Sequence, residues 1–128
     1  MTATRLVGLD RIQHARDLLS GVVRVTPMEH AREFAEAFGG PVHLKCENLQ
    51  RTGSFKVRGA YTRIHGLSAE ERARGVVAAS AGNHAQGVAL AASLVGTQAT
   101  VFMSRKAPLP KVAATRGYGA DVHLVGTA

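Results

Sequence analysis

VVAASAGNHAQGVALAASLVG, residues 76–96, is the stretch that decides the fold class of this chain. Its first four residues, Val76–Ala79, form an uninterrupted apolar run of the kind that makes a short buried strand. Asn83–Val95 is rich in small apolar residues and is followed by Gly96, which is typical of a buried helix that ends at a glycine. A strand that leads through a short polar loop into a helix is the opening of a βαβ unit.

The alternation of strand and helix continues after this stretch. Residues 100–103 predict a second strand, residues 110–116 a helix that stops at Gly117, and residues 120–125 a third strand. Strands that alternate with helices join through right-handed crossovers into a parallel sheet. We therefore predict an α/β fold with a three-layer open parallel sheet. Since little sequence follows the last strand, we expect the sheet to be incomplete.

The residues before position 76 carry shorter patterns. Apolar spacing predicts helices over residues 9–19, 28–38 and 54–64, the last with Ser54 as its N-cap, and a short strand over residues 41–46. Ser68 and Glu71 have the spacing of a capping box, which predicts a further short helix that stops at Gly75.

Composition places the chain among ordinary globular proteins. Its 128 residues, 45% of them apolar, suffice for one domain or for one domain and part of another. No apolar run approaches the roughly 20 residues of a membrane span, and residues 1–10 lack the pattern of a secretory signal. The single cysteine, Cys46, cannot form a disulfide within the chain. These features predict a cytoplasmic protein that does not bind membranes.

The net charge of +7 raises the possibility of a nucleic-acid partner. The arginines are scattered along the chain, however, and do not form a basic block. Two tyrosines, four phenylalanines and no tryptophan leave few side chains on which bases could stack. We therefore expect no nucleic-acid partner.

A lysine at a predicted helix start is the first candidate for chemistry. It is Lys56, within ENLQRTGSFKVRGAY at residues 47–61. The positive end of the helix dipole disfavours the charged form of its amine, Phe55 could supply an apolar wall, and Arg58 is a second cation nearby in sequence. A lysine in such surroundings forms Schiff bases. The same spacing also describes an ordinary solvated lysine on a helix.

The loop between the strand at Val76–Ala79 and the following helix is the second candidate. Backbone N–H groups at a helix start bind anions, and ligands of open α/β sheets lie at this edge. Ser80 adds a hydroxyl and Asn83 an amide, although Asn83 would equally serve as a helix N-cap. His84 could act as an acid or base, or could be structural.

Several other kinds of site lack their sequence motif. The chain has no G-x-G-x-x-G for a dinucleotide, no G-x-x-x-x-G-K-[ST] for a nucleotide phosphate and no G-x-S-x-G nucleophile elbow. Its histidines are far apart and no C-x-x-C or H-x-x-x-H occurs, so no zinc site is predicted. They are His14, His30, His43, His65, His84 and His123.

Three motifs together resemble a known family. They are ENLQRTGSFKVRGAY at 47–61, SAGNHAQG at 80–87 and KVAATRGYGAD at 111–121. The similarity is to the pyridoxal-phosphate-dependent threonine dehydratases (threonine ammonia-lyases), which have the tryptophan-synthase-β-like fold, fold type II. The cysteine and threonine synthases of that fold usually read S-x-K-D-R and S-G-N-T instead. Serine racemases share nearly the same strings and stay open as an alternative.

The resemblance implies a role for each matching residue. Lys56 would form the internal aldimine with pyridoxal 5'-phosphate and then remove the substrate Cα proton. Phe55 would pack near the cofactor ring, and Asn83 would hydrogen-bond its phenolic oxygen. The substrate carboxylate would bind the loop of Ser80, Ala81, Gly82, Asn83 and His84. L-Threonine, and L-serine as well, would then be converted to a 2-oxo acid and ammonia.

The resemblance also implies a domain division. Residues 1–50 match the start of the family's large domain and residues 51–128 most of its small domain. The family's phosphate-binding glycine-rich cup would follow residue 128, so we expect this piece alone to be inactive and the complete protein to be a homo-oligomer. Isoleucine biosynthesis is the implied pathway. The alternatives are a serine racemase or serine dehydratase of the same fold, and a non-catalytic binding module on this scaffold.

Overall fold

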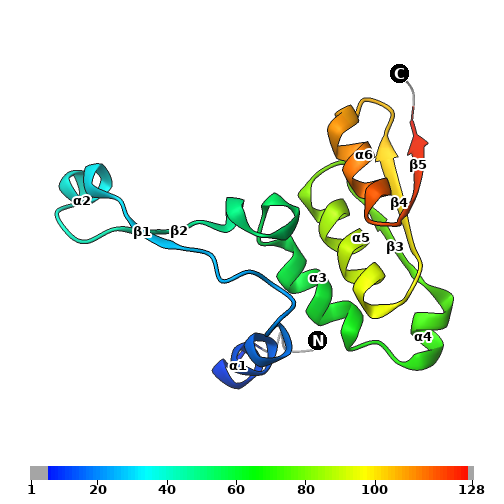
Figure 1. Cartoon of the computed structure of the whole chain (residues 1–128), viewed down its shortest axis with the longest axis horizontal. Helices are drawn as coiled ribbons and strands as arrows, with labels where there is room; N and C mark the ends of the chain where they lie inside the picture. The colour runs from blue at the N-terminus through cyan, green and yellow to red at the C-terminus, as the bar shows by residue number, and fades with distance from the viewer. Residues whose placement is uncertain (1–5, 127–128) are drawn as a thin grey trace.

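The computed structural model describes residues 6–126, and the predicted domain limits at residues 1 and 128 lie outside that range. A three-stranded sheet in the order β3-β4-β5 lies at one end of the molecule (Figure 1). The three strands are parallel and in direct register, so that Ala78 pairs with Val101 and Val101 with Val122. The α/β class and the open parallel sheet are therefore confirmed. The elements of this part are α3 (Lys56–His65), α4 (Ala69–Arg74), β3 (Val76–Ala79), α5 (Asn83–Val95), β4 (Ala99–Ser104), α6 (Leu109–Gly117) and β5 (Asp121–Val125).

One face of the sheet carries the hydrophobic core. Alternate side chains of the strands point to this face, where α5 and α6 cover them, and α3 packs on α5. Val101 and Met103 of β4 are almost fully buried there. Their neighbours on the other face are open to solvent, with Val77 72% and Phe102 37% exposed. The helices α5 and α6 thus cover the same side of the sheet.

The sequence placed every element of this part within two residues of its observed ends. The capping box before α4 is present in full. The Glu71 backbone N–H donates to Ser68 Oγ at 3.2 Å, and the Ser68 N–H donates to Glu71 Oε2 at 2.8 Å. Two first-turn donors are thereby satisfied, which explains why so short a helix forms here.

The helix predicted over residues 28–38 is wrong in its first half. Met28–His30 is a strand, β1, which pairs antiparallel with β2 (His43–Lys45), and only Arg32–Phe38 is helical, α2. The apolar spacing is compatible with a helix, but the partner strand lies thirteen or more residues away in sequence. Its backbone groups pair with those of β1, and such distant pairing overrides local preference.

The first part of the chain lies apart from the sheet. Figure 1 shows the β1–β2 ribbon and α2 projecting to one side, while α1 (Leu9–Leu18) lies below α3. Two short 3₁₀ turns, η1 (Glu47–Leu49) and η2 (Arg51–Gly53), connect this region to α3. None of the described helices is long and apolar enough to cross a membrane.

Candidate active site

Lys56 is the first residue of α3, as predicted, and its side chain is exposed. Ser54 is not the N-cap, because Phe55 already has helical backbone angles, φ −66° and ψ −9°, and takes the cap position itself. The buried Ser54 hydroxyl instead accepts a long hydrogen bond of 3.4 Å from the Lys56 N–H. The serine therefore supports the turn that presents Lys56.

The Phe55 ring lies beside the Lys56 amine. The distance from Lys56 Nζ to the ring centroid is 4.8 Å, which is within the range of a cation–π contact. The ring itself is more than half exposed. An apolar wall next to the amine was predicted, and this contact supplies it.

Gly87, one turn into α5, lies against the backbone of Lys56. A Cβ atom at position 87 would stand 3.0 Å from the Lys56 carbonyl carbon and 3.2 Å from both its Cβ and its carbonyl oxygen. Those separations are shorter than packed side chains normally allow, so a glycine lets the two helices approach this closely. Since α5 begins at Asn83, about 6 Å before Gly87 along the helix axis, its start is brought close to Lys56.

The turn that precedes Lys56 is strained. Thr52 has φ 67°, a left-handed conformation that is unfavourable for a β-branched residue, and Gly53 follows with φ 68°. Thr52 Oγ1 is buried without a hydrogen-bond partner in the described structure, as is Nε2 of Gln86 in the neighbouring α5. Strain and unpaired polar atoms of this kind concentrate at functional sites. The sequence patterns gave no signal for either residue.

The start of α5 is open to a ligand. Its N-cap is Gly82, which offers no side chain to the first-turn N–H groups, while the Gly82 N–H donates to Ser80 Oγ at 3.3 Å. Asn83 is the first helical residue and does not cap the helix, so the N-cap alternative is not the one that the structure shows. Its Oδ1 accepts a hydrogen bond of 2.6 Å from Lys111 Nζ on α6.

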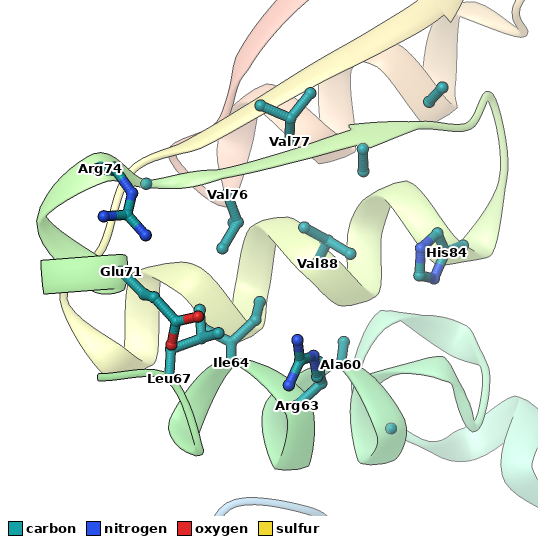
Figure 2. Close-up of a pocket in the computed structure, with 14 residues that line it drawn as sticks. Ala60, Arg63, Ile64, Leu67, Glu71, Arg74, Val76, Val77, His84 and Val88 are labelled. Atoms are coloured by element: carbon teal, nitrogen blue, oxygen red, sulfur yellow. The ribbon is translucent and has the colours of Figure 1, made fainter. Parts of the chain in front are cut away.

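His84 lines a hollow that the other candidate site residues do not line. Its ring lines a hollow of about 620 Å³ between α3, α4, β3 and α5, together with Arg63, Glu71 and Val88 (Figure 2). Neither Lys56 nor Ser80 nor Asn83 lines that hollow. The His84 imidazole therefore lines a hollow to which none of the three other candidate side chains contributes.

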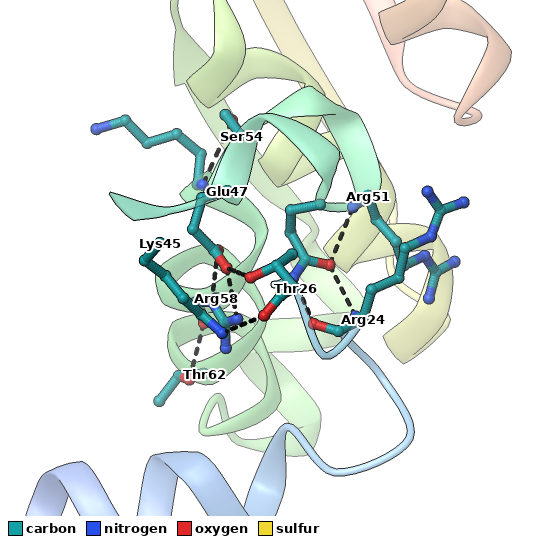
Figure 3. A network of polar contacts seen from close by, with 10 residues as sticks. Arg24, Thr26, Lys45, Glu47, Arg51, Ser54, Arg58 and Thr62 are labelled. Atoms are coloured by element: carbon teal, nitrogen blue, oxygen red, sulfur yellow. Dashed lines mark hydrogen bonds and ion pairs between the residues drawn. The ribbon is translucent and has the colours of Figure 1, made fainter. Parts of the chain in front are cut away.

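A polar network holds the segment that leads into Lys56 (Figure 3). Arg58 donates to both carboxylate oxygens of Glu47, at 2.7 Å and 2.8 Å, and Thr26 Oγ1 donates to Glu47 at 2.6 Å. The Arg58 guanidinium is the main cause that lowers the pKa of Glu47 from 4.5 to about 2, with the Thr26 hydroxyl assisting against the effect of burial. Glu47 in turn raises the pKa of Arg58. Arg58, the second cation near Lys56 in sequence, is therefore paired with Glu47.

Gln50 extends the network toward the start of the chain. Its side chain is almost fully buried and bonds twice with Arg24: the Arg24 N–H donates to Oε1 and the Gln50 amide donates to the Arg24 carbonyl, both at 2.8 Å. Lys45 Nζ donates to the Thr26 carbonyl at 2.7 Å. Residues 24–26 and 45–51 are thus joined by side chains, which sequence periodicity does not reveal.

The start of α3 carries an exposed primary amine, and the start of α5, the helix that packs against α3, carries an amide and N–H groups that no side chain caps. Such a set suits an aldehyde that bears an anionic group. In the part of the chain that the structure describes, no group of three or more His, Cys, Asp or Glu side chains could hold a metal ion. The family model described as "Pyridoxal-phosphate dependent enzyme" matches residues 19–128. The chain belongs to this family.

Relatives of this pyridoxal-phosphate-dependent chain share extensive sequence. The L-threonine ammonia-lyase of Thermotoga maritima is 54% identical over 121 residues, which cover 94% of the chain and 30% of the relative. The catabolic L-threonine dehydratase TdcB of Escherichia coli K12 is 47% identical over 120 residues, 94% of the chain and 36% of the relative. Maize serine racemase superimposes with a TM-score of 0.88 at 35% identity, over 97% of the chain and 38% of that structure. The chain spans about a third of the length of these proteins.

The residues present fit the family's cofactor. Lys56 offers the amine that reacts with an aldehyde, and its amine is solvent-accessible beside an aromatic ring. Asn83 can donate from Nδ2, because its Oδ1 already accepts from Lys111. The first turn of α5 has N–H groups that no side chain caps. These are the groups that would face pyridoxal phosphate and its substrate.

Proposed function

We propose that the protein is a threonine ammonia-lyase, which deaminates L-threonine and also L-serine to a 2-oxo acid and ammonia, and that this chain supplies its lysine-bearing part. The observation that carries the proposal is the placement of Lys56. Its amine is exposed at the start of α3, and Gly87, one turn into α5, packs against its backbone. The 54% identity to a threonine ammonia-lyase supports the choice of substrate.

Lys56 has two tasks in this proposal. Its amine would hold the cofactor covalently and, when free, would take the proton from the substrate Cα. Phe55 keeps one side of the amine apolar, since its ring lies 4.8 Å from Nζ. Gly87 packs against the Lys56 backbone and so fixes the backbone position from which the Lys56 side chain extends.

The loop before α5 binds the rest of the substrate. Ser80 and the backbone N–H groups of residues 81–84 receive its carboxylate, because a helix start concentrates donors and positive potential. Asn83 donates from Nδ2 to the phenolic oxygen of the cofactor. When bound, pyridoxal phosphate supplies the electron sink that allows the Cα proton and then the β-hydroxyl to leave.

The domain limits and cellular role belong to the same proposal. Residues 1–50 are the start of a large domain and residues 51–128 most of a small one, which agrees with a core whose members lie between residues 60 and 122. The complete protein would be a cytoplasmic homo-oligomer. Isoleucine biosynthesis is the proposed pathway, although the Escherichia coli relative is named as catabolic.

Serine racemase is the second candidate. The superposition on the maize enzyme, with a TM-score of 0.88, favours it on backbone geometry. Sequence identity is lower for that protein, at 35%, than for the Thermotoga lyase, at 54%. Racemase and lyase share the lysine and the loop in their motifs. The two activities therefore have to be distinguished by their reaction products.

The test is an assay of the complete protein loaded with pyridoxal phosphate. L-Threonine should yield 2-oxobutanoate, and Lys56→Ala should abolish this product. D-Serine from L-serine, in excess over pyruvate, would identify a racemase instead. Absence of any cofactor absorbance band would indicate a non-catalytic binding module.

A further inference from the structure

A lysine on α6 contacts the first residue of α5. Lys111 Nζ donates to Asn83 Oδ1 at 2.6 Å, across the contact between these two helices. Lys111 lies in the first turn of α6, where the helix dipole disfavours a cation. The four ion pairs found among residues 6–126 do not include it. Its charge is thus directed at an amide and not at a carboxylate.

The chemistry of an ammonium group fixes the orientation of the amide. An ammonium has three donors and no acceptor, so it can contact the oxygen of Asn83 but not the nitrogen. A carboxamide without such a partner can turn by half a rotation and exchange its donor and acceptor sides. With Oδ1 held by Lys111, Nδ2 and its two donors are presented on the opposite side.

We propose that Lys111 is a positioning residue, which holds Asn83 so that Nδ2 donates to the phenolic oxygen of pyridoxal phosphate. This inference rests on the proposed function, which places Asn83 at that oxygen. An ionised phenolic oxygen only accepts hydrogen bonds, so the reversed amide would set two acceptors against each other. Lys111 disfavours the reversed orientation of the Asn83 amide. It also places a positive charge on the side of the amide opposite the Nδ2 donor.

The experiment uses the complete holoenzyme and compares Lys111→Met with Lys111→Arg and with Lys106→Met. The last variant removes the same charge from an exposed lysine of the loop before α6. The readouts are the pH midpoint of the bound cofactor's absorbance and kcat for L-threonine. We expect Lys111→Met to raise the midpoint, since phenolate stabilisation and a nearby positive charge are both lost. We also expect kcat to fall about threefold to tenfold, the usual result of losing one hydrogen bond.

Lys111→Arg, which keeps a cationic donor, should recover most of both effects, and Lys106→Met should match the wild type. All variants should have the melting temperature of the wild type, which would show that Lys111 affects the position of Asn83 and not the folding of the protein. In an Asn83→Ala background, Lys111→Met should no longer lower kcat, and its effect on the midpoint should shrink to the part that comes from the lost positive charge. Equal behaviour of Lys111→Met and Lys106→Met, or undiminished effects of Lys111→Met in the Asn83→Ala background, would overturn the proposal. Failure of the proposed function would look different, because the wild type itself would then lack the absorbance band or would not convert L-threonine to 2-oxobutanoate.

Discussion

Residues 51–126 and residues 6–50 are held in place by different forces. The first region has a hydrophobic cluster whose members lie between residues 60 and 122. In the second, α1, β1, α2 and β2 have no buried residue, and the buried side chains before position 51 are Leu19, Thr26 and Gln50. Burial of apolar area stabilises the first region directly. The second is attached mainly through the polar network around Glu47 and Gln50.

The difference explains where the candidate site lies. Lys56 stands at the boundary, at the start of the first helix of the packed region, and the network of Glu47 and Arg58 fixes the segment before it. The packed region supplies a rigid support through Gly87 and α5. The Lys56 amine therefore combines a firm backbone with an exposed side chain.

A substitution in the core should have the largest effect. Met103, on the central strand, is 1% exposed, so Met103→Ala should lower the free energy of unfolding by about 2–5 kcal/mol. Phe38→Ala in the first region, where the ring is 77% exposed, should change it by less than about 0.5 kcal/mol. Denaturant titration of the complete protein measures both. Similar losses for the two variants would refute the contrast between the regions.

Gly87→Ala should have a smaller effect on stability but a direct one on the site. The added methyl group meets the Lys56 backbone at about 3 Å, so overpacking should cost about 1–3 kcal/mol and displace Lys56. Occupancy by pyridoxal phosphate, measured by absorbance, should fall as well. Gly117→Ala on α6 is the matched control, because a Cβ there meets no atom within 4 Å. If both variants bind the cofactor equally, Gly87 does not position Lys56.

Glu47→Gln tests the junction between the two regions. It removes the carboxylate that Arg58 and Thr26 bind, and the expected loss is about 1–2 kcal/mol of unfolding free energy. Amide hydrogen exchange should rise in residues 24–30 and 43–50, while the sheet stays protected. Exchange that rises equally in β3–β5 would show that the network supports the whole fold.

The same carboxylate predicts an acid dependence. The pKa of Glu47 is about 2 in the folded protein against 4.5 ordinarily, so the unfolded chain binds the proton first as pH falls. The contribution of Glu47 is therefore complete above about pH 4.5 and is lost as the pH falls toward 2. Glu47→Gln should remove this part of the acid transition. An unchanged pH profile between wild type and variant would contradict the assigned pKa.

Local patterns predicted the packed region well and the other region poorly. The strand at Val76–Ala79, the helix at Asn83–Val95 and the capping box at Ser68 are set by neighbouring residues, so short stretches of sequence reveal them. The strand at Met28–His30 depends on a partner at residues 43–45, which periodicity does not show. Pairing between distant segments is the information that a single pattern lacks.

The site shows the same division. Lys56 and the loop at Ser80 were evident because motif and helix start coincide. The pairing of Arg58 with Glu47, the contact of Gly87 with Lys56 and the bond from Lys111 to Asn83 all join residues distant in sequence. Each of them changes the interpretation of a residue that the sequence had singled out.

The central claim is that Lys56, at the boundary of the two regions, carries the cofactor. Borohydride reduction of the complete holoenzyme, followed by peptide mapping, tests it directly. The account predicts a stable pyridoxyl label on the peptide that contains Lys56. A label on Lys45, Lys106 or Lys111 instead would contradict it.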